Sequence, residues 1–166
     1  MPGGAAAGLA GLQAGVARDD ESWAGLIARQ LRPEPRVEEG KQARMAGASA
    51  MIDISDGLAV DLAHLVDASG VGCDVDPGAL PIDPALTRVE LPQGMGCPTD
   101  LAIVGGEDFE LLFAIDERLE EPLKRSFDSL GTGLTRIGTV TDGAARIGDE
   151  ELDTWRKRGW EHLRTR

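Results

Sequence analysis

The sequence predicts an α/β (α+β) fold in which helices pack on a mixed sheet. Short apolar runs typical of strands alternate along the chain with segments whose apolar residues recur at helical spacing. Turn-forming clusters separate these segments, with 22 glycines and 9 prolines among 166 residues. This length is enough for one domain with a hydrophobic core and marginal for two, so we expect a single domain over residues 1–166.

Three helices are expected before the first strand. The first is a weakly helical, alanine-rich run, and prolines 33 and 35 end the second. The third is short, and a strand follows it. The expected helices cover residues 1–17, 23–31 and 37–45, and the strand covers residues 48–54.

The second half of the chain alternates in the same way. A helix is expected from residue 58 to about 68, ended by Gly70. Residues 76–98 contain five prolines and read as a long irregular loop, which is typical of a lid or a binding loop. The expected strands are 71–75, 109–115, 134–140 and 145–147, and the expected helices are 99–104, with Thr99 as its cap, and 117–130.

Charge and composition narrow the class of partner. The net charge is −12, from 29 acidic and 17 basic residues, which argues against nucleic acid or an anionic membrane. Cys73 and Cys97 lack metal-type spacing, and no leader or long apolar run is evident, so a reduced cytoplasmic setting is expected. The acidic charge does not exclude a small phosphorylated ligand, because a divalent metal can bridge carboxylates and phosphate oxygens.

An acidic motif stands where the first strand is expected to turn into a helix. Asp53, Ser55, Asp56 and Gly57 follow the apolar run. One interpretation makes both carboxylates Mg²⁺ ligands and lets Ser55 bond a phosphate or nucleotide oxygen. The other makes Ser55 or Asp56 a helix cap and Asp53 a solvated strand end, and chemistry alone favours this second interpretation.

A second acidic motif precedes the strand expected at 109–115. Two glycines at 105–106 allow close approach of a ligand or a strand, and Glu107 and Asp108 follow them. A tight turn with exposed acids explains the pattern equally well. No glycine-rich phosphate loop is present, and His64, expected to be a partly buried packing residue, has no triad partner.

These segments together resemble a known family. MIDISDGLAVDLAHL, a proline-rich stretch, GGEDFELLFAI, IGTV and a terminal RGWEHL occur in this order. The set resembles the C-terminal half of the thiamine-monophosphate kinases, which belong to the superfamily of aminoimidazole ribonucleotide synthetase and selenophosphate synthetase. The resemblance covers essentially the whole chain and implies the fold of that superfamily's C-terminal domain.

The resemblance also implies an activity and a set of site residues. Members of this family transfer the γ-phosphoryl group of ATP to the phosphate of thiamine monophosphate, and Mg²⁺ ions carry the charge. By motif match, Asp53 and Asp56 would be Mg²⁺ ligands and Ser55 would contact ATP. Glu107 would contact the substrate, and Trp160 would pack on the substrate ring.

The family's N-terminal domain, which carries further Mg²⁺ ligands, much of the ATP site and the usual dimer contact, is expected to be absent from these 166 residues. The chain is therefore expected to be inactive alone, with a homo-oligomer or an N-terminal domain as its partner. One alternative is a non-catalytic module for ligand binding or protein association. Another is a different reaction of the same superfamily, but the acidic junction followed by GGED favours the thiamine branch.

Overall fold

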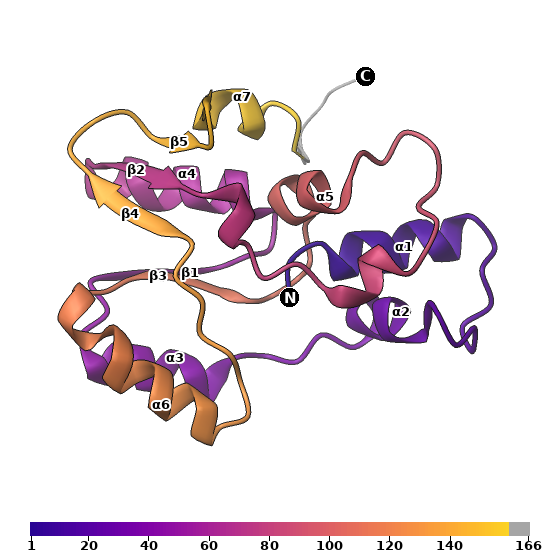
Figure 1. The fold of residues 1–166 in the computed structure, drawn as a ribbon, viewed down its shortest axis with the longest axis horizontal. Helices are drawn as coiled ribbons and strands as arrows, with labels where there is room; N and C mark the ends of the chain where they lie inside the picture. The colour runs from indigo at the N-terminus through magenta and orange to yellow at the C-terminus, as the bar shows by residue number, and fades with distance from the viewer. Residues whose placement is uncertain (160–166) are drawn as a thin grey trace.

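The computed structural model describes residues 1–159, and its elements form three groups around a two-stranded sheet (Figure 1). The helices are α1 (Gly4–Gln13), α2 (Ala24–Leu31), α3 (Val37–Ala46), α4 (Leu58–Ser69), α5 (Pro98–Val104), α6 (Glu120–Ser129) and α7 (Leu152–Arg156). The strands are β1 (Ala50–Asp53), β2 (Gly72–Val75), β3 (Leu111–Ala114), β4 (Gly138–Thr141), β5 (Arg146–Ile147) and β6 (Glu150–Glu151). Single 3₁₀ turns are η1 (Pro77–Ala79), η2 (Pro84–Thr87) and η3 (Glu117–Leu119).

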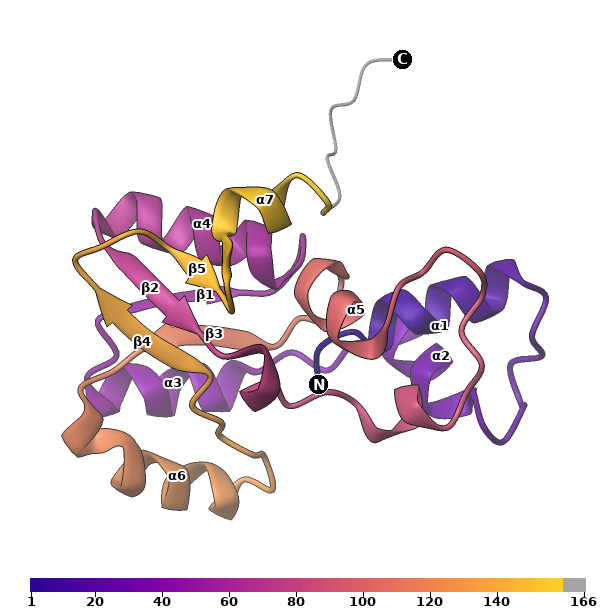
Figure 2. The ribbon, with the colours of Figure 1, turned by 45° about the horizontal axis from the view of Figure 1, so that its top comes forward.

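The strands divide between two sheets. β1 and β3 pair antiparallel, from Ala50 opposite Ala114 to Asp53 opposite Leu111. The second sheet has the order β4-β2-β5-β6, in which only the β2–β5 pair is parallel. Figure 2 shows β4, β2 and β5 of this sheet. The predicted α/β class with mixed strand directions is confirmed, although the strands do not form one sheet. The strand expected at 134–140 is shifted, because β4 begins only at Gly138.

The β1–β3 sheet separates two apolar clusters, as the alternation of side chains along a strand requires. Met51 and Phe113 are register partners and pack with α3 and α6, where the rings of Phe113 and Phe127 lie 6.1 Å apart. The next pair along the ladder includes Leu112, which packs instead against the cluster built on α4, β2 and α7. The β1–β3 pair is thus fixed from both sides, and its end next to Asp53 is a firm support.

The proline-rich segment 76–98 is packed against the molecule. Its residues Leu86, Leu91 and Met95 belong to a cluster with α1, α2 and α5. Asp76 and Asp83 each accept a backbone N–H two residues on, so η1 and η2 both begin with a side-chain cap. The expectation of a lid therefore gains no support from the packing of this segment.

Two smaller expectations are wrong. The cap of α5 is Cys97 rather than Thr99, because the Cys97 N–H donates to Asp100 Oδ2 at 2.9 Å. His64 is exposed on α4 rather than partly buried. No helix among the described residues is long and apolar enough to cross a membrane.

Helices α1 and α2 touch at Gly8, which leads to a prediction. A Cβ at Gly8 would lie 2.2 Å from the Leu26 carbonyl oxygen. We expect Gly8→Ala to lower the free energy of unfolding by about 2 kcal/mol through overpacking, although alanine favours a helix by about 1 kcal/mol over glycine. Urea unfolding measures the change. Gly25→Ala in α2 is the control, because nothing lies within 4 Å of its Cβ position, and this variant should be slightly more stable.

Candidate functional site

The first acidic motif lies between β1 and α4. Asp53 is the last residue of β1 and is exposed, Ile54 is buried in the main core, and Ser55 and Asp56 are half-buried. Gly57 precedes the first residue of α4. The structure therefore places two carboxylates and one hydroxyl at a strand-to-helix junction.

A buried carboxylate holds this junction from the helix side. Oδ2 of Asp61, which is 3% exposed, accepts the N–H groups of Ser55 at 2.9 Å, Asp56 at 3.0 Å and Gly57 at 3.2 Å. Burial raises the pKa of Asp61, and these hydrogen bonds oppose the rise. Sequence reasoning missed Asp61, although an acidic residue in the first turn of a helix is a known signal for a side chain that reaches back to the preceding backbone.

The helix-capping interpretation of the motif is wrong for both side chains. The residue at the N-cap position of α4 is Gly57, and no side chain caps the helix from there. The Ser55 hydroxyl lies 3.5 Å from Asp56 Oδ1, which is a long contact within the motif itself. Neither Ser55 nor Asp56 is thus the N-cap residue of α4.

The second acidic motif is joined to the first by backbone hydrogen bonds. The Glu107 N–H donates to the Ser55 carbonyl at 2.8 Å, and the Phe109 N–H donates to the Ile54 carbonyl at 2.8 Å. A Cβ at Gly106 would lie 2.6 Å from the Ser55 carbonyl oxygen, so this approach requires glycine. The two motifs, far apart in sequence, therefore lie side by side.

Glu107 presents its side chain to solvent beside helix α2. Its backbone has φ 66°, a left-handed conformation that is uncommon for a residue other than glycine. Its Oε2 accepts a hydrogen bond from Nε2 of Gln30 at 2.7 Å. Sequence reasoning had no signal for Gln30, because the contact joins residues from two distant segments.

Asp108 turns away from Glu107 and holds the start of α1. Its Oδ2 accepts the Gly3 N–H at 2.6 Å and its Oδ1 accepts the Ala5 N–H at 3.0 Å. Burial raises the pKa of Asp108 to about 6, against the pull of these N–H groups and of the Met1 ammonium. The second acidic cluster is thus divided between an exposed carboxylate and one that fixes the fold.

The buried carboxylate of Asp108 is expected to make the stability of the fold depend on pH. An acid whose pKa is higher in the folded than in the unfolded protein stabilises the fold at low pH, and this stability is lost as pH rises through the folded pKa. A rise from the ordinary 3.8 to about 6 corresponds to about 3 kcal/mol. We therefore expect the stability of the unmutated protein relative to Asp108→Asn to fall by up to that amount between pH 4 and 7, measured by urea unfolding. A difference that does not change with pH would contradict this.

Glu110 is the next carboxylate along the chain, and it is fully paired. Arg36 donates Nε to its Oε2 at 3.0 Å and Nη2 to its Oε1 at 3.1 Å, and the Met1 ammonium also contacts it. Burial acts to raise the pKa of Glu110, but the guanidinium and the ammonium outweigh burial and lower it. Glu39 also pairs with this guanidinium, with its Oε1 3.6 Å from Nη1 of Arg36.

The predicted tryptophan of the site, Trp160, lies outside the described residues. Trp155, five positions earlier in the sequence, is buried in the main core at 8% exposure, and the guanidinium of Arg158 stacks on its ring at 4.5 Å. Trp155 is therefore a core residue.

The junction offers carboxylate and hydroxyl oxygens, which are donors of the kind that Mg²⁺ binds. The carboxylates of Asp61, Asp108 and Glu110 are engaged by protein N–H groups, whereas Asp53 is exposed and lies next to Ser55 and Asp56 in sequence. Mg²⁺ commonly binds one or two carboxylates and completes its shell with water and substrate phosphate. Within residues 1–159 no group of three or more His, Cys, Asp or Glu side chains could hold a metal ion by itself.

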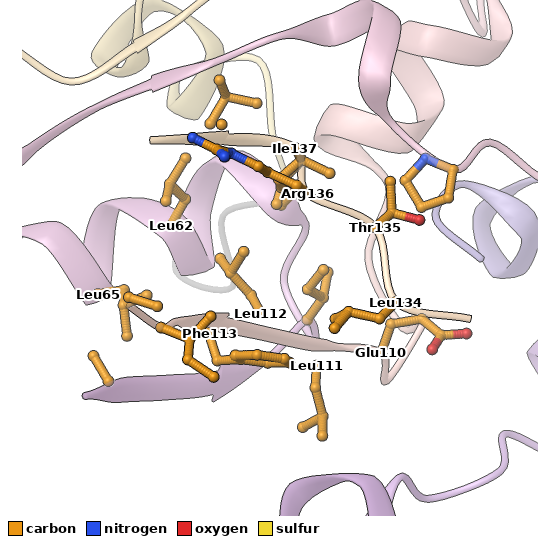
Figure 3. Close-up of a pocket in the computed structure, with 18 of the residues that line it drawn as sticks. Leu62, Leu65, Glu110, Leu111, Leu112, Phe113, Leu134, Thr135, Arg136 and Ile137 are labelled. Carbon is orange, nitrogen blue, oxygen red and sulfur yellow. The ribbon is translucent and has the colours of Figure 1, made fainter. Parts of the chain in front are cut away.

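A cavity of about 950 Å³ lies behind the junction. Figure 3 shows its wall formed by Leu62 and Leu65 of α4, Leu112 of β3 and the segment before β4 that includes Ile137. Most of the labelled residues are apolar, with Glu110, Arg136 and Thr135 as the exceptions. The full lining also includes Arg29, Arg36 and several serines and threonines. The motif match, and not the character of this lining, makes the carboxylate junction the candidate phosphate site.

The chain matches the family described as AIR synthase related protein, C-terminal domain, over residues 3–149. It is 41% identical over 169 residues to the thiamine-monophosphate kinase of Escherichia coli (strain K12), covering 99% of this chain and 50% of that protein. It is also 41% identical over 130 residues to the thiamine-monophosphate kinase of Methanospirillum hungatei JF-1, covering 78% of this chain and 39% of that protein.

Solved structures are also similar to this chain. The crystal structure of thiamine-monophosphate kinase from Stenotrophomonas maltophilia K279a has a TM-score of 0.82 and 36% identity, covering 91% of this chain and 48% of that one. AaThiL complexed with AMPPCP and TMP has a TM-score of 0.76 and 29% identity, with coverage of 91% and 46%. The chain spans about half the length of the curated relatives and solved structures it matches.

Proposed function

The chain belongs to the family of the AIR synthase related protein, C-terminal domain, and from this premise we propose that it forms one side of a site that phosphorylates thiamine monophosphate with ATP. Its homologues are thiamine-monophosphate kinases. The observation that carries the proposal is the hydrogen bond from the Glu107 N–H to the Ser55 carbonyl. This bond supports the proposal because it joins the two segments to which the resemblance assigns nucleotide and substrate contacts.

In this proposal Asp53 and Asp56 hold Mg²⁺ and Ser55 contacts the nucleotide. When bound, Mg²⁺ neutralises charge on the phosphate oxygens. The chain itself contributes position, because the paired end of β1 and the first turn of α4 fix the backbone from which these side chains project. Phosphoryl transfer depends mainly on positioning and electrostatic stabilisation, which are the contributions proposed for Asp53, Ser55 and Asp56.

Glu107 contacts thiamine monophosphate in this proposal. Its carboxylate is exposed and held at one oxygen by Gln30, so it remains able to accept hydrogen bonds from a ligand. The packing of Trp160 on the substrate ring stays a prediction from the resemblance. The solved structure of AaThiL complexed with AMPPCP and TMP supports the choice of probes.

Isothermal titration calorimetry tests the proposal. Mg²⁺-dependent binding of AMPPCP and binding of thiamine monophosphate are expected for the unmutated chain, and Asp53→Ala or Asp56→Ala should weaken the Mg²⁺-dependent binding at least about tenfold, since each removes a charged ligand. Asp153→Ala, an exposed acid on α7, is the control and should leave binding unchanged. No Mg²⁺-dependent binding by the unmutated chain would favour the non-catalytic module.

A second experiment concerns turnover. We expect the 166 residues to produce no thiamine diphosphate alone, and to gain activity when the separately prepared N-terminal half of a homologous kinase is added. A coupled assay that follows ADP release measures both conditions. Full kinase activity without the added half would contradict the expectation of an incomplete site.

A further inference from the structure

We propose that Asp61 is the positioning residue for both halves of the site, so that one buried carboxylate sets the geometry of the nucleotide side and the substrate side together. The inference rests on the proposed function for its effect on ligands. Its structural part stands on hydrogen bonds alone and can be tested without any ligand.

Three backbone N–H groups converge on one carboxylate oxygen at this turn. Asp61 Oδ2 accepts the consecutive N–H groups of Ser55, Asp56 and Gly57 at 2.9, 3.0 and 3.2 Å. By comparison, Asp100 Oδ2 accepts the Cys97 N–H, and Asp20 Oδ1 accepts the N–H groups of Ser22 and Trp23. Three donors on one acceptor define the path of the whole turn, and with it the direction in which the Ser55 and Asp56 side chains leave the backbone.

The position of Glu107 also depends on Asp61, through Ser55. The Ser55 residue is held at both of its backbone polar groups, because its N–H donates to Asp61 and its carbonyl accepts the Glu107 N–H at 2.8 Å. A shift of this residue therefore moves the Glu107 backbone as well. Glu107 already has a left-handed backbone, which persists only while its surroundings fix it.

Water cannot take the place of the Asp61 carboxylate as the acceptor for this turn. The side chain is 3% exposed, and Gly57 at the end of the turn is buried. When the carboxylate is removed, the three N–H groups lose their acceptor, and the Gly57 N–H loses it in a buried place. The turn is therefore expected to open in order to hydrate them. The turn would then no longer hold Ser55, Asp56 and Glu107 in one arrangement.

Amide hydrogen exchange measured by NMR on the full chain tests the structural part. In Asp61→Ala the amides of Ser55, Asp56 and Gly57 should exchange at least about tenfold faster, and that of Glu107 should also be faster. The Ile54 amide, which donates to the Glu110 carbonyl, is the internal reference and should stay protected. If the alanine variant does not fold, Asp61→Asn decides, because its neutral oxygen keeps the shape and weakens the bonds, with about threefold faster exchange expected. Unchanged exchange at the three amides overturns the proposal.

Calorimetry tests the effect on ligands. Asp61→Ala should weaken Mg·AMPPCP and thiamine monophosphate together, by about tenfold each, while Asp61→Asn should recover part of both affinities. Asp116→Ala is the matched control, because Asp116 also accepts a backbone N–H, that of Arg118, but follows β3 at the opposite end of the ladder from Asp53. Binding that Asp61→Ala leaves unchanged, or that weakens for one ligand only, overturns the proposal. If the unmutated chain binds neither ligand, the proposed function fails for this chain, and the exchange data alone decide the role of Asp61.

Discussion

Replacing Arg36 by alanine is expected to lower the free energy of unfolding by about 4 kcal/mol, because breaking a partly buried ion pair leaves an uncompensated charge. Arg36 is 21% exposed at its side chain and donates two hydrogen bonds to Glu110, which is 19% exposed. Glu39 is buried beside the same guanidinium. Without Arg36, two partly buried carboxylates would face each other.

The pH dependence of this loss identifies its cause. In the unmutated protein the pKa of Glu110 is lowered, so its contribution to stability is present above its ordinary pKa of 4.5 and is lost as pH falls. In Arg36→Ala burial and the contact with the Met1 ammonium remain, but the guanidinium is lost. The pKa of Glu110 should therefore rise relative to the unmutated protein, and acid should relieve the variant. Urea unfolding at pH 7 and pH 4 should therefore show a smaller difference at pH 4.

Arg118→Ala is the control for arginine removal. Arg118 forms an exposed ion pair with Asp116, and exposed pairs contribute little. Its replacement should change stability only slightly at both pH values. An Arg36→Ala loss that is as small as the Arg118→Ala loss, or one that is the same at pH 7 and pH 4, would contradict the explanation.

Local pattern was sufficient to predict the junction that carries the first motif. The apolar run before Asp53 and the helical spacing from Leu58 are short-range signals, and the structure has β1 and α4 at these places. Gly70 ends α4 with φ 66°, as a glycine at a helix C-terminus often does. Each of these features is decided within a few residues, which is why sequence reasoning could find them.

Features that depend on distant partners could not be predicted in this way. The Arg36–Glu110 pair joins residues 74 positions apart, and nothing local to either residue indicates the other. The strands are four residues long or shorter, so packing rather than intrinsic preference decides which of them pair. The segment from Leu134 to Ile137 has strand-like composition but lies along the cavity wall and does not extend β4. The site roles of Asp53, Ser55, Asp56, Glu107 and Trp160 stay predictions.

Replacing Gly57 by alanine should separate the two motifs and cost about 4 kcal/mol of unfolding free energy. Gly57 has φ 113° and ψ 149°, close to a region that is essentially limited to glycine, where strain amounts to about 1–3 kcal/mol. A Cβ there would also lie 2.8 Å from the Val104 carbonyl oxygen, directly before the glycines of the second motif. Overpacking of this kind costs about 1–3 kcal/mol more, and backbone atoms cannot yield as a side chain can.

Gly70→Ala separates the two causes. Gly70 lies at the other end of α4 with φ 66°, but nothing lies within 4 Å of its Cβ position, so it should show only the cost of the left-handed backbone, about 1 kcal/mol. Urea unfolding gives both costs, and the exchange rate of the Glu107 amide reports whether the motifs stay joined. We expect faster exchange in Gly57→Ala and an unchanged rate in Gly70→Ala. Equal costs with no change at Glu107 would mean that Gly57 serves the helix end alone, and that the contact between the motifs does not depend on the close approach of Gly57 to Val104.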